Sequence, residues 1–214
     1  MERIELDGVI PKVFSDKERT DSDVWNKKMI FEKGKSYLVE AISGAGKSSL
    51  CSFIYGYRKD YEGTISFDGR DVKMLSRRDW TVIRRKNIGM MFQELRLFPE
   101  LTSRENVTIK NNITQFRDLD RIRTWFRVLG IEDKWSEPVG MMSLGQQQRV
   151  AFVRMLCQPA DFLIMDEPVS HLDDENGRIM GRILEQEMNE RGVGVIVTSI
   201  GRRMEMNYDA KIKM

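Results

Sequence analysis

The chain has few of the residues and segments that build metal sites, disulfide frameworks and membrane spans. Its 214 residues include one histidine, His171, and two cysteines. Cys51 and Cys157 are too few for a disulfide scaffold or a cysteine-rich zinc site, so we expect a reducing, cytosolic environment. No apolar run approaches the ~20 residues of a membrane-spanning helix. We also find no signal peptide or lipidation motif.

An excess of charge of either sign is missing as well. Lys and Arg number 35 against 33 Asp and Glu, a net charge of +2. This balance gives no support to nucleic acid as a partner. One segment, residues 70–86, is locally basic and contains only two acids, Asp71 and Asp79. Two interpretations of it stay open: contact with anionic lipid headgroups at the cytoplasmic leaflet, or a solvated helix face with ordinary ion pairs.

The first informative motif is a glycine-rich loop at residues 41–48, Ala-Ile-Ser-Gly-Ala-Gly-Lys-Ser. A strand-like segment precedes it at 36–40 and a helix-like segment follows at 49–55, which is the setting of a phosphate-binding P-loop. In such a loop the backbone N–H groups surround phosphate oxygens, Lys47 reaches the β- and γ-phosphates, and the Ser48 hydroxyl binds magnesium. The alternative is a glycine-rich loop with a chance Lys-Ser.

The second motif is a pair of acids after an apolar run. Residues 162–165, Phe-Leu-Ile-Met, are typical of a strand buried on both faces, and Asp166 and Glu167 end it. Open α/β sheets bind their ligands at the carboxyl ends of such strands. Asp166 can hold magnesium, and Glu167 can orient and deprotonate a water. Acid pairs also cap helices, but the presence of a P-loop in the same chain favours the site.

Residues 142–151, Met-Ser-Leu-Gly-Gln-Gln-Gln-Arg-Val-Ala, precede the acids and discriminate among P-loop proteins. They resemble the signature of the ATP-binding cassette (ABC) ATPases, Leu-Ser-Gly-Gly-Gln, and the resemblance extends over nearly the whole chain. Residues 88–93 are similar to the family's Q-loop, whose glutamine, here Gln93, contacts magnesium and the attacking water. Residues 170–173 are similar to its D-loop. Residues 97–102 are similar to the same region of importers and of lipoprotein-releasing and macrolide exporters.

The resemblance implies a single α/β nucleotide-binding domain over residues 1–214, with the P-loop NTPase fold of the ABC type. A mostly parallel core sheet flanked by helices would come from residues 1–93 and 142–214, together with an N-terminal antiparallel β subdomain. An α-helical subdomain would occupy about 94–141, where the pattern at 118–130 predicts a helix that ends at a glycine. We see no internal repeat and no second cassette.

The same resemblance implies that two such domains enclose two ATP molecules, each bound by the P-loop of one chain and the signature of the other. The implied cofactors are ATP and Mg²⁺. The residues implied at the metal are Ser48, Gln93 and Asp166. The residues implied in catalysis are Lys47, Gln93, Glu167 and Ser199. The residues implied in nucleotide binding are Phe14, Ser43, Gly44, Ala45, Gly46, Lys47, Ser48, Ser49, Ser143, Gly145, Gln146 and Asp173. Phe14 would stack on adenine, although an isolated phenylalanine is more often a core residue.

Two glycines of the family pattern are replaced. Ala41 stands at the first glycine of the P-loop, where it is tolerated if its φ is negative. Leu144 stands at the first signature glycine. The groups expected to face phosphate across the dimer remain, namely Ser143 and the N–H of Gly145 at the start of a helix.

A third departure concerns catalysis. Residues 192–199 form an apolar strand, expected beside the P-loop strand or the acid-pair strand, and end in Thr-Ser where the family has Thr-His. The only histidine, His171, lies in the D-loop. Ser199 can donate one hydrogen bond, but it is shorter than histidine and cannot become cationic. We therefore expect slow hydrolysis.

Three functions are compatible with these motifs. The first is the ATPase subunit of an ABC transporter or mechanotransmission complex, peripheral on the cytoplasmic face of the membrane, which dimerises around ATP and drives a separate integral membrane permease. The second is an ATP-gated regulatory dimer with little hydrolysis and no transport, which Ala41, Leu144 and Ser199 favour. The third is a P-loop kinase or other soluble NTPase, against which the signature and the Q-loop argue. In the first two the chain pairs with a second nucleotide-binding domain, in a homodimer or a heterodimer.

Overall fold

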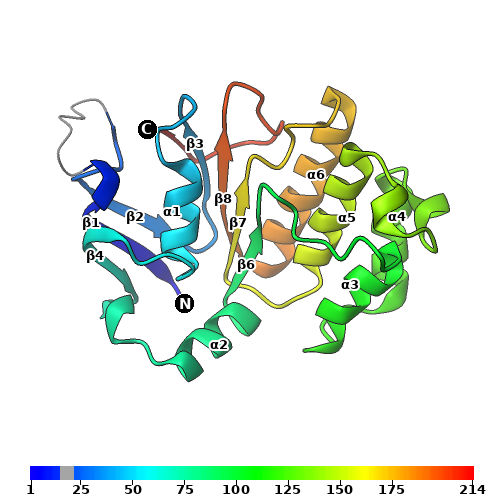
Figure 1. Cartoon of the computed structure of the whole chain (residues 1–214), viewed down its shortest axis with the longest axis horizontal. Coiled ribbons are helices and arrows are strands. Elements are labelled where there is room, and N and C mark those ends of the chain that lie inside the picture. The colour runs from blue at the N-terminus through cyan, green and yellow to red at the C-terminus, as the bar shows by residue number, and fades with distance from the viewer. Residues whose placement is uncertain (15–21) are drawn as a thin grey trace.

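A five-stranded parallel sheet forms the centre of the chain (Figure 1). The computed structural model describes residues 1–14 and 22–214. In spatial order the strands are β6 (Ile88–Met91), β7 (Phe162–Asp166), β8 (Gly194–Ser199), β3 (Ser36–Glu40) and β9 (Ala210–Lys213). Neighbouring strands are parallel throughout, which confirms the mostly parallel core. β8 pairs with both the P-loop strand and the acid-pair strand.

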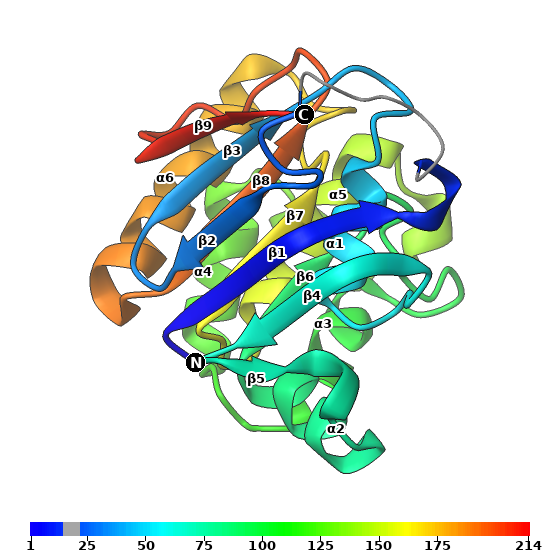
Figure 2. The same cartoon turned by 90° about the vertical axis from the view of Figure 1, so that its left-hand side faces the viewer.

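A second, antiparallel sheet from the first part of the chain lies to one side of the parallel sheet (Figure 2). Its strands, in spatial order, are β2 (Lys28–Glu32), β1 (Arg3–Pro11), β4 (Tyr61–Phe67) and β5 (Arg70–Asp71). In β1, buried Ile4 and Leu6 alternate with polar neighbours, as expected of a strand with one face on a core. The expected N-terminal antiparallel part is confirmed.

The buried strands place alternate side chains in two separate cores. In β7, Leu163 and Met165 belong to one apolar cluster, and Phe162 and Ile164 belong to the other. α1 (Lys47–Ile54) packs in the second cluster, between the two sheets. α5 (Leu144–Leu156) and α6 (Asp174–Arg191) pack in the first. The P-loop helix and the signature helix therefore cover opposite faces of the parallel sheet (Figure 1).

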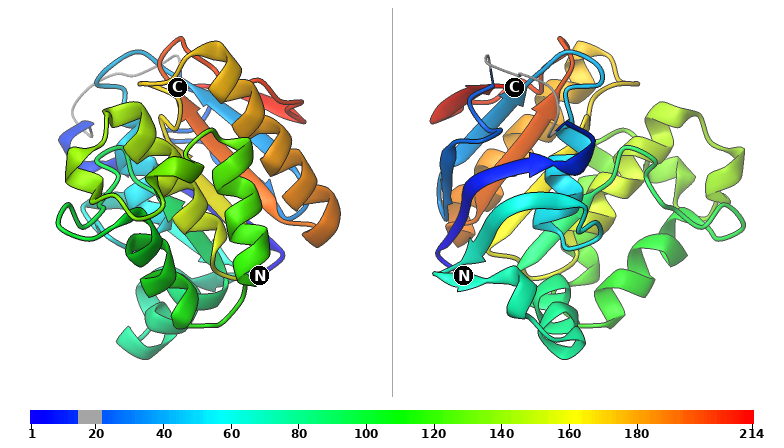
Figure 3. Two further views of the ribbon diagram at one scale, coloured as in Figure 1. Left: turned by 90° about the vertical axis from the view of Figure 1, so that its right-hand side faces the viewer. Right: turned by 60° about the vertical axis from the view of Figure 1, so that its left-hand side comes forward.

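Three further helices begin at capping residues. They are α2 (Arg77–Lys86), capped by Ser76, α3 (Ser103–Asn112), capped by Thr102, and α4 (Leu119–Val128), capped by Asp118. In each, the cap oxygen accepts the N–H three residues on and so satisfies one of the unpaired donors of the first turn. α4 ends just before Gly130, whose φ is +63°, so the helix predicted at 118–130 is confirmed. α3 and α4 stand beyond α5, away from the sheets (Figure 3); we call residues 94–141 the helical lobe.

A buried carboxylate fastens the helical lobe to α6. Glu187 is fully buried, and it pairs with Arg117 and Arg121 of the lobe and, at 2.8 Å, with Arg191 of its own helix. Removing one partner of such a cluster leaves an uncompensated buried charge, which is strongly destabilising. The lobe is therefore held to the core by charge as well as by apolar contact.

Both cysteines are buried and free, in agreement with the sequence. Burial raises the pKa of the Cys51 and Cys157 thiols, so they stay protonated and unreactive. No helix within residues 1–14 and 22–214 combines the length and the apolar character needed to cross a membrane.

Candidate functional site

The loop between β3 and α1 has the backbone of a phosphate-binding loop. Gly44 and Gly46 adopt φ values of +78° and +101°, a region that favours glycine. A Cβ at Gly46 would also lie 2.9 Å from the Trp25 ring and 3.0 Å from the Phe14 ring, so no other residue fits there. Ala41 is not among the described residues with a positive φ. Alanine is thus accepted without backbone strain, as expected.

A hollow of about 310 Å³ opens above this loop, within the range of small-ligand sites. It is lined by Phe14, Ser43, Gly44, Gly46, Lys47, Ser48, Ser49, Gln93, Glu167 and Ile200. Nine of these ten residues were candidates from the sequence, and Ile200 was not. Ala45 is buried and does not line the hollow, and its carbonyl accepts a hydrogen bond from the Trp25 indole at 2.9 Å. Phe14 belongs to the buried apolar cluster and also lines the hollow.

Lys47 and Glu167 face each other in this hollow. The Lys47 Nζ lies 3.7 Å from a Glu167 carboxylate oxygen and 3.4 Å from the Ile42 carbonyl. Glu167 follows β7 directly and has a φ of +52°, a left-handed conformation that costs a non-glycine residue about 1–2 kcal/mol. Such strain persists only where neighbours hold the residue, and it is concentrated at functional sites.

Asp166, the last residue of β7, is held by the neighbouring strand. Its Oδ1 accepts a hydrogen bond from the Thr198 hydroxyl at 2.6 Å, and the Thr198 oxygen in turn accepts the Glu167 N–H at 3.2 Å. The sequence did not identify Thr198 as a site residue. Ser48 and Gln93 line the hollow, whereas Asp166, the residue before Glu167, is buried and is not among the lining residues. All three side chains carry oxygen atoms, the donor type that magnesium prefers.

Ser199 is not brought to the hollow. It is buried at the end of β8, and its hydroxyl donates to the Arg202 carbonyl three residues on. The next residue, Ile200, is 44% exposed and lines the hollow instead. A short hydroxyl finds an acceptor within its own turn, whereas a longer side chain would extend beyond it. In this structure, therefore, no polar side chain of the β8 turn lines the hollow.

The signature residues are ordered at the start of α5. The Ser143 oxygen accepts the Gln146 N–H at 3.3 Å, and the Gln146 side chain accepts the Ser143 N–H at 2.9 Å, which is a capping box. Leu144 is 55% exposed. A Cβ at Gly145 would lie 2.8 Å from the His171 carbonyl, so glycine is required there by close contact with the D-loop.

The D-loop residue Asp173 caps α6. Its carboxylate accepts the Asn176 N–H at 2.7 Å, and this hydrogen bond lowers the pKa of Asp173. Neither Asp173 nor the signature residues line the P-loop hollow. Since α1 and α5 cover opposite faces of the sheet, the chain does not present its own signature to its own P-loop.

Gln148, which the sequence did not single out, joins the signature helix to Glu167. Its side-chain amide donates to the Glu167 carbonyl at 3.1 Å and to the Ser170 hydroxyl at 3.2 Å, and it accepts the His171 N–H at 3.2 Å. Its spacing from Phe152 and Met155, both buried on α5, could have placed it on the inner face of the helix.

The segment after Gln93 is held from the other end of α5. Leu95 and Arg96 have φ values of +59° and +50°. Arg154 donates to the carbonyl oxygens of both residues at 2.7 Å, one from each terminal nitrogen. Burial lowers the pKa of Arg154 to about 10. This fork fixes the path of the chain from the Q-loop into the helical lobe.

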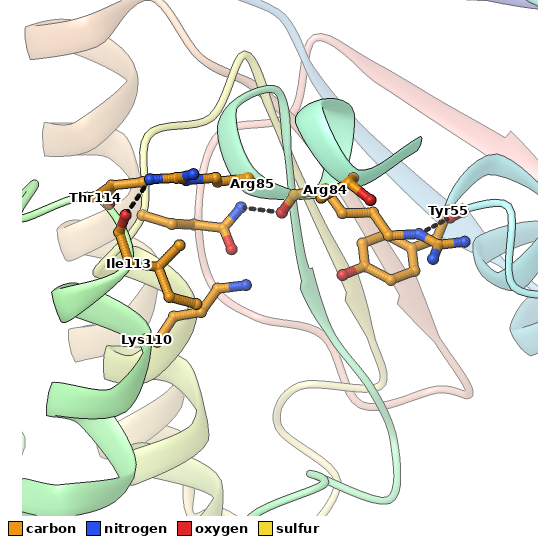
Figure 4. Close-up of a pocket in the computed structure, with 8 residues that line it drawn as sticks. Tyr55, Arg84, Arg85, Lys110, Ile113 and Thr114 are labelled. Carbon is orange, nitrogen blue, oxygen red and sulfur yellow. Dashed lines mark hydrogen bonds between the residues drawn. The ribbon is translucent and has the colours of Figure 1, made fainter. Parts of the chain in front are cut away.

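A cationic pocket of about 370 Å³ lies between the core and the helical lobe (Figure 4). It is lined by Tyr55, Thr81, Arg84, Arg85, Lys110, Ile113, Thr114 and Gln158, with no carboxylate among them. Arg84 and Arg85 donate to backbone carbonyls. Burial, and then the charge of Arg154, lowers the pKa of Lys110, whose side chain points into the pocket toward Tyr55 (Figure 4).

The Thr114 hydroxyl is buried without a hydrogen-bond partner at the same pocket. A groove lined by Phe92, Arg96 and Arg154 adjoins the pocket and shares Tyr55 and Lys110 with it. Part of the basic segment at 70–86 thus faces the protein, because Arg84 and Arg85 belong to this pocket.

Comparison with known proteins agrees with this geometry. The protein-family model described as ABC transporter matches residues 26–170. The ABC transporter ATP-binding protein YtrE of Bacillus subtilis (strain 168) is 29% identical over 191 residues, which cover 85% of this chain and 83% of YtrE. The lipoprotein-releasing system ATP-binding protein LolD of Syntrophus aciditrophicus (strain SB) is 30% identical over 171 residues, which cover 78% and 77% of the two chains.

Among solved structures, the dimeric structure of MJ0796, a bacterial ABC transporter cassette, superposes with a TM-score of 0.77 at 27% sequence identity. The match covers 92% of this chain and 87% of that one.

Proposed function

The chain belongs to the ABC transporter family, and from this we propose how its residues bind and slowly hydrolyse ATP within a dimer. The observation that carries the proposal is that Lys47, Gln93 and Glu167, from three separate segments, line one hollow above a glycine-rich loop. The loop N–H groups and the N-terminus of α1 favour the negative charge of a triphosphate. Lys47 binds the β- and γ-phosphates.

Glu167 is the proposed general base. Its carboxylate orients and deprotonates the water that attacks the γ-phosphorus. Ser48, Gln93 and Asp166 would hold magnesium through oxygen atoms. A bound magnesium ion stabilises the charge that develops on the transferred phosphoryl group. The Thr198 hydroxyl keeps Asp166 and the Glu167 N–H in place from the neighbouring strand.

The second half of each site comes from another nucleotide-binding domain. Ser143 and the Gly145 N–H stand at the start of α5, where the helix dipole favours an anion, and they do not line the hollow above the P-loop of their own chain. We infer that they bind the γ-phosphate held by the partner chain, with Gln146 and Asp173 supporting the loops at that interface. ATP then closes the dimer.

Turnover is proposed to be slow because the position after Thr198 contributes no side chain to the γ-phosphate. Loss of one preorganised donor typically costs ~10² to 10³ in rate. Ser199 is turned to the Arg202 carbonyl, and Ile200 adds an apolar side chain to the hollow.

The proposed partner beyond the dimer is an integral membrane permease, with the chain peripheral on the cytoplasmic face of the membrane. The cationic pocket and the adjoining groove lie where the Q-loop enters the helical lobe, so a segment bound there contacts the path to Gln93. No carboxylate lines the cationic pocket or the adjoining groove. We therefore infer that the permease segment places an acidic side chain against Lys110 and Arg85.

The turn of Ser199 away from the hollow also favours a second function, an ATP-gated regulatory dimer with little hydrolysis and no transport. The two are separated by expressing the chain with its genomic neighbours and purifying it from solubilised membranes. A detergent-stable complex with a multi-span protein supports the transport function, and a purely soluble partner contradicts it.

A test of the proposed site itself needs no partner. Wild-type chain should bind a fluorescent ATP analogue and release phosphate slowly, whereas Lys47→Ala should lose at least tenfold in affinity. Equal binding by both chains would contradict the site.

A further inference from the structure

We propose that Gln148 is a positioning residue that couples the two ATP sites of the dimer, an inference that rests on the proposed dimer. Each site needs Glu167 from one chain and the start of α5 from the other. Gln148 joins these two elements within each chain, because it lies on α5 and bonds to the Glu167 carbonyl. The state of one site is thereby transmitted to the catalytic base of the other.

The three described hydrogen bonds of the Gln148 side chain all go to one short segment, residues 167–171. Its nitrogen donates to Glu167 and Ser170, and its oxygen accepts from the His171 N–H. The residue is 1% exposed. Buried amide hydrogen bonds are stronger than exposed ones, and leaving such a group unpaired is costly. A displacement of α5 is therefore transmitted to residues 167–171.

Glu167 is sensitive to that displacement because its backbone is held on both sides. Its N–H bonds to Thr198 of β8, and its carbonyl bonds to Gln148 of α5. Its left-handed φ of +52° depends on these neighbours. Rotation of this peptide re-aims the carboxylate, and a misplacement of ~1 Å can cost ~10² in rate.

The start of α5 cannot move independently of the D-loop. The backbone at Gly145 packs so closely that a Cβ would lie 2.8 Å from the His171 carbonyl. Gln148 follows one turn later and accepts the His171 N–H. When the partner's γ-phosphate binds Ser143, the first turns of α5, the D-loop and Glu167 thus respond as one unit.

Gln147 provides a matched control on the same helix. Its side-chain amide donates to the Met142 carbonyl at 2.9 Å, one turn back on its own chain, and it does not contact residues 167–171 by any described hydrogen bond. Gln147 and Gln148 have the same side chain and are adjacent residues of α5. They differ in whether the amide is bonded to the Glu167 segment.

The experiment measures steady-state ATP turnover of the dimer for wild type, Gln148→Met, Gln148→Glu and Gln147→Met. Methionine keeps the side-chain length and removes the polar atoms. Glutamate keeps the acceptor oxygen and replaces the donor nitrogen by a second oxygen, which adds a negative charge. We expect both Gln148 variants to lower kcat by ~10- to 100-fold, with KM within about threefold and the Hill coefficient for ATP falling toward one. Gln147→Met should match wild type.

A double-variant cycle distinguishes coupling from simple packing. If Gln148 transmits the engagement of Ser143, then Ser143→Ala combined with Gln148→Glu should be no slower than the slower single variant. Multiplied losses, or an unchanged kcat in both Gln148 variants, would overturn the inference. If Gln148→Met fails to fold, as judged by its melting temperature, Gln148→Glu and Ser170→Ala test the same hydrogen bonds.

Failure of the Gln148 proposal can be distinguished from failure of the proposed dimer. ATP-dependent dimerisation is measured by light scattering in the Glu167→Gln background, with and without Gln148→Glu. A background that stays monomeric in ATP contradicts the dimer itself. If the Glu167→Gln chain dimerises in ATP but the Gln148 variants turn over at the wild-type rate, only the proposed role of Gln148 is contradicted.

Discussion

Lys47 and Glu167 face each other across the phosphate hollow, with the lysine nitrogen 3.7 Å from the nearer carboxylate oxygen. Their side chains are 4% and 12% exposed, so their attraction is screened less than that of a surface pair. A γ-phosphate placed in the hollow competes for Lys47. In the proposed function the lysine would then bind phosphate, and the released carboxylate would be available to a water. Substrate binding would thus prepare the base.

Glu167→Gln should stop hydrolysis and leave ATP binding intact. The amide cannot take a proton from water, and it removes a negative charge that repels the γ-phosphate. We expect at least a 100-fold fall in kcat and tighter retention of ATP, measured by phosphate release and by nucleotide retained after gel filtration. Turnover within tenfold of wild type would remove Glu167 from the role of base.

Ser199→His should raise turnover by about 10- to 100-fold if the missing side chain limits the rate. Histidine is long enough to pass the Arg202 carbonyl, to which the serine hydroxyl is bonded, and its ring can donate to the γ-phosphate. Ser199→Asn, which is polar but shorter, is the control. An unchanged rate in Ser199→His would show that another step, or the apolar Ile200, limits hydrolysis.

Arg154→Lys should slow turnover without weakening ATP binding. A lysine carries the charge but cannot hold the Leu95 and Arg96 carbonyls together with a planar fork. The two left-handed residues then lose the bonds that fix them, and the Q-loop with Gln93 is placed less accurately. We expect a loss of about tenfold in kcat with KM nearly unchanged. Arg178→Lys, on an exposed ion pair, should leave both values unchanged.

Glu187→Ala should be among the most destabilising single substitutions. It leaves Arg117 and Arg191, whose side chains are each 14% exposed, without their carboxylate, and removing one partner of a buried ion pair costs about 3–5 kcal/mol. Urea unfolding should show this loss. Glu190→Ala, on the same helix with an exposed pair to Arg121, should cost at most about 1 kcal/mol. Equal losses in both variants would contradict the role of the buried cluster.

The parts of the site that sequence could predict are local. Residues 41–48 carry their own backbone geometry through Gly44 and Gly46, and the apolar run before Asp166 specifies a buried strand that ends there. These patterns predicted the phosphate loop and the position of Glu167, whereas the parallel sheet and the other candidates that line the hollow were implied by the family resemblance. The sequence could not predict whether Ala41 is tolerated in place of glycine, because this depends on the sign of its φ, which the fold of the loop sets.

The parts that sequence missed depend on contacts between distant segments. Thr198 supports Asp166 only because β8 pairs with β7, and Gln148 reaches Glu167 only because α5 packs behind that turn. Ser199 stands where the family resemblance expects a histidine, and this assignment stays a prediction. Its orientation depends on the Arg202 carbonyl in the following turn, which no spacing rule specifies. The roles of Phe14 in stacking and of residues 94–141 as a separate subdomain stay predictions.

We propose that ATP holds two cassettes together because hydrolysis is slow. Multi-angle light scattering of the wild-type chain with magnesium and ATP tests it most directly. We expect a dimer that persists for minutes in ATP without any catalytic substitution, and a monomer in ADP. A wild-type chain that is monomeric in ATP, while Glu167→Gln dimerises, would show fast turnover and contradict the account.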